Sequence, residues 1–80
     1  MKVHGVNKYG VYSNDVEIVS GDMFSVDIED VSEDLASRIL NRGLEIKFVV
    51  DSIDEEKGLV YAKNFDYPIP AQAILKYIKD

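Results

Sequence analysis

The sequence predicts a mainly β domain: a small five-stranded barrel with a helix between its third and fourth strands and a short C-terminal helix. Three observations favour this class. Short apolar stretches alternate with polar residues, the spacing of apolar residues becomes helical once in mid-chain, and turn-forming residues separate these segments. The 80 residues are enough for one domain, residues 1–80.

The first two expected strands occupy the N-terminal quarter of the chain. Residues 3–12 have the composition of a strand, and Gly5 and Gly10 within it indicate a bend or bulge. Residues 13–15 predict a turn, because Ser, Asn and Asp side chains bond readily to their own backbone. Residues 16–19 would then form the second short strand.

The third expected strand has the clearest pattern. Residues 20–22 (Ser-Gly-Asp) predict a turn, and strict alternation follows over residues 23–29. We expect Phe24, Val26 and Ile28 on its buried face.

A helix is predicted over residues 32–41. Asp30 is the expected N-cap, with Glu33 reaching back to it in a capping box. Gly43 is expected to end the helix with positive φ. The apolar residues that recur at helical spacing are Leu35, Ala36, Ile39 and Leu40.

A hairpin is predicted from residues 44–50 and 59–65, joined by a charged segment that ends in glycine. Ile46, Phe48 and Val50 alternate with polar or exposed positions, so we expect them to be buried.

The end of the chain predicts a short helix that begins at Pro70, because proline suits the first helical position. Its apolar stripe consists of Ala71, Ile74, Leu75 and Ile78.

The predicted order β-β-β-α-β-β is that of an OB-fold barrel. Another small barrel, SH3-like or PilZ-like, and an open α+β sheet are the alternatives. Within this order, four stretches resemble parts of the cold-shock domains, OB-folds that bind single-stranded RNA and DNA. They are Lys8-Tyr9, Asp22-Met23-Phe24, residues 43–52 and residues 57–65.

The resemblance stops at the positions that would bind nucleic acid. The aromatic strand of the cold-shock domains is replaced by Asn-Asp-Val-Glu-Ile at residues 14–18, and Val26 stands in place of a histidine. Since stacking on aromatic rings contributes about 1–3 kcal/mol per base, the resemblance implies the fold more than the activity.

The charge is unevenly distributed. The net charge is −6, yet residues 13–34 contain eight acids and no Lys or Arg, while residues 35–80 are balanced. An acidic segment of this kind either solvates a surface or recognises a basic partner. A duplex-binding surface is disfavoured because it needs clustered bases.

Catalytic groups are scarce. The chain has no cysteine and one histidine, His4, and it has no glycine-rich phosphate loop or metal-ligand motif. We therefore expect no enzyme activity, no cofactor and no metal. The absence of cysteine and of a long apolar run predicts a cytoplasmic protein away from membranes.

The preferred hypothesis is a regulatory or adaptor module that binds a protein with a basic surface, and a nucleic-acid-binding protein is one partner of this kind. Its expected contact residues are Asp15, Glu17, Asp22, Asp27 and Glu29.

Two alternatives stay open. One is a structural subunit of a homo-oligomer. The other is a degenerate cold-shock-like module that binds single strands through Lys2, Lys8, Tyr9, Tyr12 and Phe24.

Overall fold

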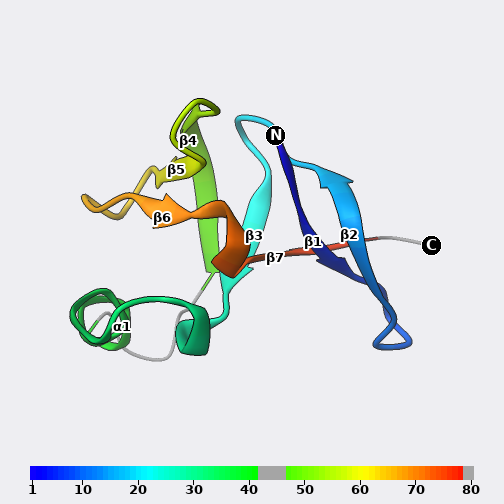
Figure 1. Cartoon of the computed structure of the whole chain (residues 1–80), viewed down its shortest axis with the longest axis horizontal. Helices are drawn as coiled ribbons and strands as arrows, with labels where there is room; N and C mark the ends of the chain where they lie inside the picture. Colours follow the sequence, from blue (N-terminus) through cyan, green and yellow to red (C-terminus); the bar gives the residue numbers. More distant parts are fainter. Residues whose placement is uncertain (42–46, 79–80) are drawn as a thin grey trace.

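A computed structural model of the chain describes residues 1–41 and 47–78. It contains one seven-stranded sheet in the order β2-β1-β7-β3-β4-β5-β6, with a single α-helix at one end (Figure 1). The mainly β class is confirmed. The sheet is not closed into a barrel, since β2 and β6 are its two edges, so the five-stranded OB-like barrel is not what the described residues form.

The chain begins with a hairpin. Strands β1 (Lys2–Val6) and β2 (Tyr12–Glu17) pair antiparallel, and Gly10 adopts positive φ in the turn between them. The single bent strand expected over residues 3–12 is therefore wrong. The side-chain oxygen of Asn7 accepts hydrogen bonds from the backbone N–H groups of Tyr9 and Val11, at 2.9 and 3.0 Å, and this asparagine cap sets the turn.

The turn expected at residues 13–15 is instead a bulge inside β2. Val3 pairs with Val16 and Gly5 with Ser13, so two residues of β2 face one residue of β1. Small polar residues occur both in bulges and in turns, so the composition of residues 13–15 does not distinguish the two.

The third strand is shorter than expected. β3 (Met23–Val26) ends before a 3₁₀ turn, η1 (Ile28–Asp30), whose N-cap is Asp27. Phe24 and Val26 are buried as predicted, whereas Ile28 is 36% exposed. The alternation continues through residue 29, but the Asp27 side chain accepts a hydrogen bond from the N–H of Glu29 and turns the backbone.

The helix is confirmed, with a different cap. α1 (Glu33–Leu40) begins after Ser32, whose hydroxyl accepts a hydrogen bond from the N–H of Leu35. Asp30 belongs to η1 instead. The prediction for Gly43 lies outside the described residues.

The central hairpin is also confirmed, with different bounds: its first strand runs on to Asp54 and its second ends at Ala62, instead of residues 50 and 65. β4 (Lys47–Asp54) pairs antiparallel with β5 (Leu59–Ala62), and Gly58 adopts positive φ in the turn. Phe48 and Val50 are 2% and 0% exposed. The prediction for Ile46 falls outside the described residues.

The expected C-terminal helix is wrong. Strand β6 (Ile69–Pro70) is followed by one 3₁₀ turn, η2 (Ala71–Ala73), and then by strand β7 (Ile74–Tyr77). β7 lies between β1, to which it is parallel, and β3, to which it is antiparallel. Ile74 and Leu75, two residues of the expected helical stripe, lie in a strand that is paired on both sides. This backbone pairing outweighs the helical spacing.

The core is formed mostly by buried side chains of the strands and their connections, and α1 adds one buried side chain to it. It contains a row of three phenylalanine rings. Phe24 is stacked on Phe48, and Phe48 lies edge-on to Phe65, with 5.5 Å between the ring centroids in each pair. Ile39 of α1 is fully buried against this cluster. No helix among the described residues has the length and apolar character needed to cross a membrane.

Candidate functional site

The β1–β2 hairpin forms one side of the molecule, and β2 is its outermost strand (Figure 1). Beyond the bulge, Val6 pairs with Tyr12 on one side and with Tyr77 on the other. Laterally paired residues present their side chains on the same face, so the two tyrosines flank Val6 on the outer face of the sheet. Tyr12 is 67% exposed and Tyr77 58%.

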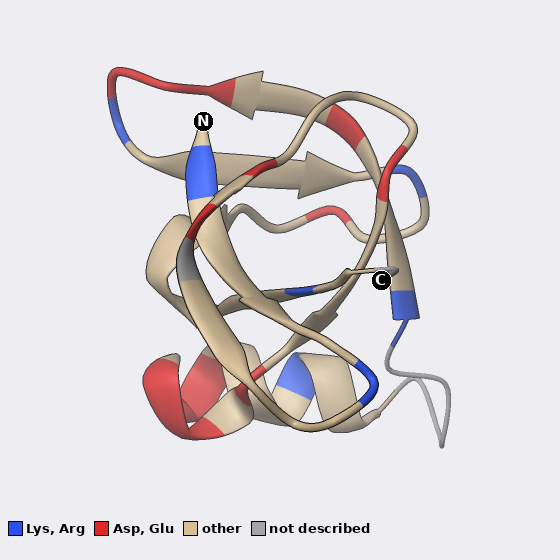
Figure 2. Cartoon of the chain, turned by 90° about the vertical axis from the view of Figure 1, so that its right-hand side faces the viewer, with Lys and Arg blue, Asp and Glu red and all other residues tan. Residues whose placement is uncertain are grey.

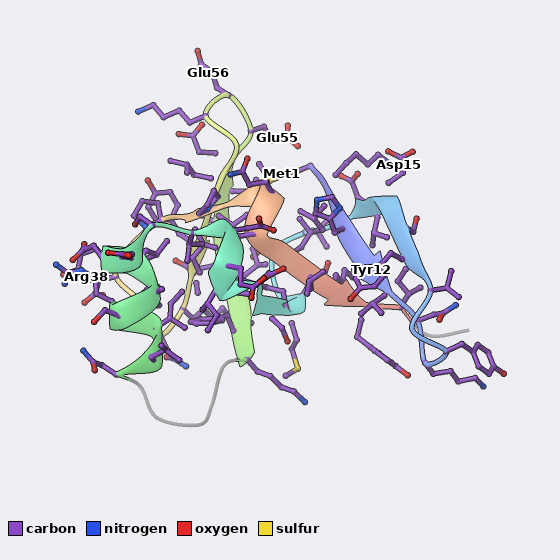
Figure 3. All side chains as sticks on the ribbon, turned by 60° about the horizontal axis from the view of Figure 1, so that its bottom comes forward. Met1, Tyr12, Asp15, Arg38, Glu55 and Glu56 are labelled. Atoms are coloured by element: carbon purple, nitrogen blue, oxygen red, sulfur yellow. The ribbon has the colours of Figure 1, made fainter. Side chains whose placement is uncertain are left out.

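The side chains of Tyr12 and Asp15 project from β2 and are exposed (Figure 3). Asp15 makes no ion pair or side-chain hydrogen bond with any residue that the structure describes. Of the acids expected to meet a partner, it is the one on the sheet edge whose carboxylate remains available.

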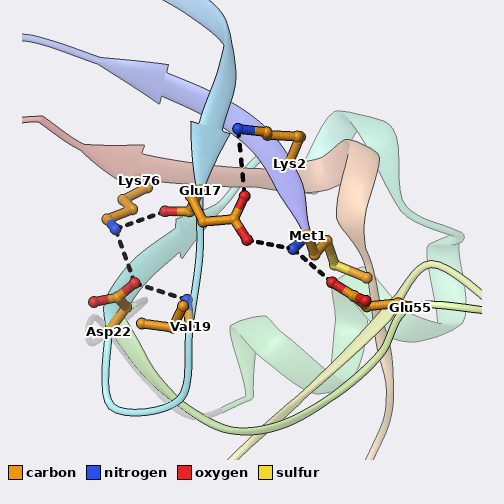
Figure 4. A network of polar contacts seen from close by, with 7 residues as sticks. All are labelled: Met1, Lys2, Glu17, Val19, Asp22, Glu55 and Lys76. Atoms are coloured by element: carbon orange, nitrogen blue, oxygen red, sulfur yellow. Dashed lines mark hydrogen bonds and ion pairs between the residues drawn. The ribbon is translucent and has the colours of Figure 1, made fainter.

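Glu17 is already engaged. Its carboxylate accepts a hydrogen bond from the N-terminal amine of Met1 at 2.8 Å and lies 3.4 Å from Lys2 Nζ (Figure 4). The hydrogen bond from the amine is the main cause that lowers the pKa of Glu17, and Lys2 acts in the same direction. The same amine reaches Glu55 at 2.7 Å, which joins the hairpin to the β4–β5 turn.

Asp22 is engaged as well. One carboxylate oxygen accepts hydrogen bonds from Lys76 Nζ at 2.8 Å and from the N–H of Val19 at 2.9 Å (Figure 4). The bond from Lys76 is the larger cause that lowers the pKa of Asp22. The eight acids of residues 13–34 have no Lys or Arg within their own segment. The fold brings bases from elsewhere to three of them, Glu17, Asp22 and Asp34.

The remaining two predicted acids belong to a different surface. Asp27 caps η1, and Glu29 is exposed beside it. Together with the first turn of α1 they form an acidic region around η1 and α1, seen at the bottom of Figure 2. In Figure 1 this region and β2 lie on opposite sides of the molecule, so the five predicted acids do not form one site.

The residues of the nucleic-acid alternative are also divided. At the hairpin tip, Lys8 Nζ lies 5.1 Å from the centroid of the Tyr9 ring, and Tyr9 is 73% exposed. Lys2, however, is held by Glu17, and Phe24 is 2% exposed in the core. Phe24 cannot stack on a base unless the domain unfolds.

A groove of about 410 Å³ lies where β3 and β7 part. The sequence does not predict this groove, because the apolar spacing of residues 71–78 favours a helix and no local pattern places residues 74–77 beside β3. Within the part of the chain that the structure describes, no group of three potential ligands is arranged to hold a metal ion.

Comparison with known proteins adds no family to this description. No family model matches the chain, and neither does any curated protein or solved structure.

Proposed function

We propose that the protein is a non-enzymatic binding module that pairs the open edge of its sheet, at β2, with an extended basic segment of a protein partner. The observation that carries this proposal is the contrast between the two edges. β2 offers six residues, whereas β6 has two and ends at Pro70. Proline has no N–H to donate, so the β6 edge is protected and the β2 edge is open.

The hydrogen bonds of the hairpin indicate which groups of β2 are available. Asn7 N–H donates to the carbonyl of Val11, so this pair is hydrogen-bonded within the hairpin. In an antiparallel ladder the next pair, Val6 with Tyr12, directs its backbone groups away from the partner strand. The N–H and C=O of Tyr12 therefore point to the open edge, where an added strand would bond to them.

Charge selects the partner. Asp15 and Glu17 lie on this edge, and Asp15 forms no ion pair with Lys or Arg among the described residues. A second copy added antiparallel through β2 would bring two such acidic strands together, which is unfavourable. A strand that carries Lys or Arg would be attracted instead, and its association would be slowed by added salt.

The test is a titration of the ¹⁵N-labelled protein with an extended peptide of alternating Lys and Val, and with its Glu–Val counterpart. We expect saturable chemical-shift changes over β2 with the Lys peptide only. Asp15→Lys should weaken binding severalfold, while Glu56→Lys, the same charge change at the exposed β4–β5 turn (Figure 3), should not. Equal effects of the two variants, or shifts away from β2, would refute edge pairing.

The same protein samples can be used to test the alternative that the protein forms a homo-oligomer. Sedimentation of the free protein should show a monomer at the concentrations used for the titration. A dimer that Asp15→Lys strengthens would favour pairing between copies over a basic partner.

The second candidate is single-strand binding at the hairpin tip, favoured by the contact of Lys8 with Tyr9 and by the exposure of Tyr12. We expect it to be weak at physiological salt because Lys2 is engaged and Phe24 is buried. Fluorescence anisotropy with mixed-sequence oligonucleotides measures it. Submicromolar binding that Tyr9→Ala abolishes would rank this function first.

A further inference from the structure

β3 and β7 are neighbours over only part of their length. They pair at Ser25 with Leu75 and at Val26 with Ile74, and no pair forms between them toward Met23 and Tyr77. Beyond these pairs β3 remains paired with β4, through Met23 and Val49, while β7 remains paired with β1. The two strands are therefore drawn apart by their other partners, and the groove opens between them.

An ion pair replaces the missing ladder. Asp22 precedes β3 and Lys76 belongs to β7, and their side chains meet at 2.8 Å with both about 25% exposed. This contact connects the two strands beyond the point where their backbone pairing stops.

The groove has apolar sides. Met23 and Tyr77 are each 58% exposed, and Leu75 is half-buried between them. A flexible methionine and a tyrosine around a concave opening are typical of surfaces that bind small apolar groups. A volume near 410 Å³ is within the range of small-molecule sites.

The polar lining is positively charged, although the protein is acidic overall. Lys47 and Lys76 line the groove against one acid, Asp22, which Lys76 already occupies. Lys47 is exposed and makes no ion pair with any residue that the structure describes. One cation beside an apolar surface complements a ligand with one negative head group and an apolar tail.

We infer that this groove is a second binding site, distinct from the β2 edge, which takes an amphipathic carboxylate: its tail lies along Met23, Leu75 and Tyr77, and its carboxylate pairs with Lys47. The ligand class follows from charge complementarity and from the size of the groove. It does not depend on the function proposed for β2.

The experiment uses dodecanoate, with dodecyltrimethylammonium as the same tail on the opposite charge and acetate as the head group alone. Each is titrated below its micelle concentration into the ¹⁵N-labelled full chain. We expect saturable shifts at Ser25, Leu75 and Tyr77 with dodecanoate, at least tenfold weaker binding of the cationic amphiphile, and none of acetate. Comparable binding of both amphiphiles, or no saturable binding of dodecanoate, would overturn the inference.

Variants locate the site. Lys47→Glu should weaken dodecanoate at least tenfold, while Lys63→Glu, the same change at an exposed lysine outside the groove, should alter it less than twofold. Asp15→Lys should leave dodecanoate binding unchanged, so that failure of the β2 proposal and failure of this one are distinguished. If Lys47→Glu and Lys63→Glu act alike, the carboxylate does not pair with Lys47. A peptide with a free C-terminal carboxylate that displaces dodecanoate at lower concentration would reassign the groove to a protein terminus.

Discussion

At the scale of single residues, Gly5 shows how closely the hairpin packs. Its φ is ordinary, so the glycine is not needed for backbone conformation. A Cβ atom added there would clash with Val16 of β2 and would lie 2.6 Å from Ile78 Cδ1. The branched Val16 side chain has little freedom to move away.

We therefore expect Gly5→Ala to lower the free energy of unfolding by about 1–3 kcal/mol. Urea denaturation of the variant measures this. Ser13→Ala, at the exposed position paired with Gly5, is the control and should change stability little. If the two substitutions have the same effect, the close approach does not limit the hairpin.

Asp22 makes the stability depend on pH. The hydrogen bonds that its carboxylate accepts from Lys76 and from the N–H of Val19 hold its pKa below its ordinary value. The folded pKa is lower than the unfolded one, so the contribution of this carboxylate is present above the unfolded value and is lost as pH falls through the folded value.

Asp22→Asn should destabilise the protein by about 1–2 kcal/mol at pH 7. The difference from the parent protein should shrink as pH falls below about 4. Urea denaturation at a series of pH values measures both. A difference that stays constant down to pH 2 would mean that the Asp22 charge has no part in stability.

At the scale of elements, the start of α1 is decided by one hydroxyl. Ser32 accepts the hydrogen bond from Leu35 N–H, whereas the side chain of Asp30 is exposed on the preceding 3₁₀ turn. The acids in the first turn of the helix, Glu33 and Asp34, suit its positive end. Asp34 also pairs with Arg38 at 3.1 Å, one turn later.

Ser32→Ala should cost about 1 kcal/mol through loss of the N-cap. Asp30→Ala should cost less than about 0.5 kcal/mol, since its side chain makes no hydrogen bond with a described residue. Thermal denaturation of both variants ranks them. A larger loss of stability with Asp30→Ala than with Ser32→Ala would mean that Asp30 is the N-cap.

At the scale of the whole molecule, β7 joins the two halves of the sheet. One half consists of β2 and β1 and the other of β3, β4, β5 and β6, and β7 lies between them in the sheet order. Its first residue, Ile74, is fully buried in the core. The last strand of the chain is thus central to the sheet.

Ile74→Ala should therefore destabilise the whole domain by about 2–5 kcal/mol, enough to raise the unfolded population strongly. Native-state hydrogen exchange should show faster exchange in β1 and β3 together, because both lose a common partner. Leu40→Ala, on the exposed side of α1, is the control. Faster exchange confined to β7 would mean that the two halves are stable without it.

The placement of the acids of residues 13–34 is also decided by the whole molecule. These eight acids are adjacent in sequence, yet the fold divides them between the β2 edge, a loop ion pair with Lys76 and the η1–α1 region. Glu17 pairs with Lys2, which is 15 positions away in the sequence, and Asp22 pairs with Lys76, which is 54 positions away. No local sequence pattern reveals either pair.

The sequence by itself determined the mainly β class, the central hairpin, the helix and the buried positions of Phe24, Phe48 and Val50. These follow from periodicity and from turn residues within a few positions of one another, so they are local properties. The tertiary structure alone decided that β7 is a strand, that β2 is the open edge, and that a groove lies beside Met23 and Tyr77. Each of these depends on which distant segments pair, and pairing energy between strands far apart in the chain is absent from any local pattern.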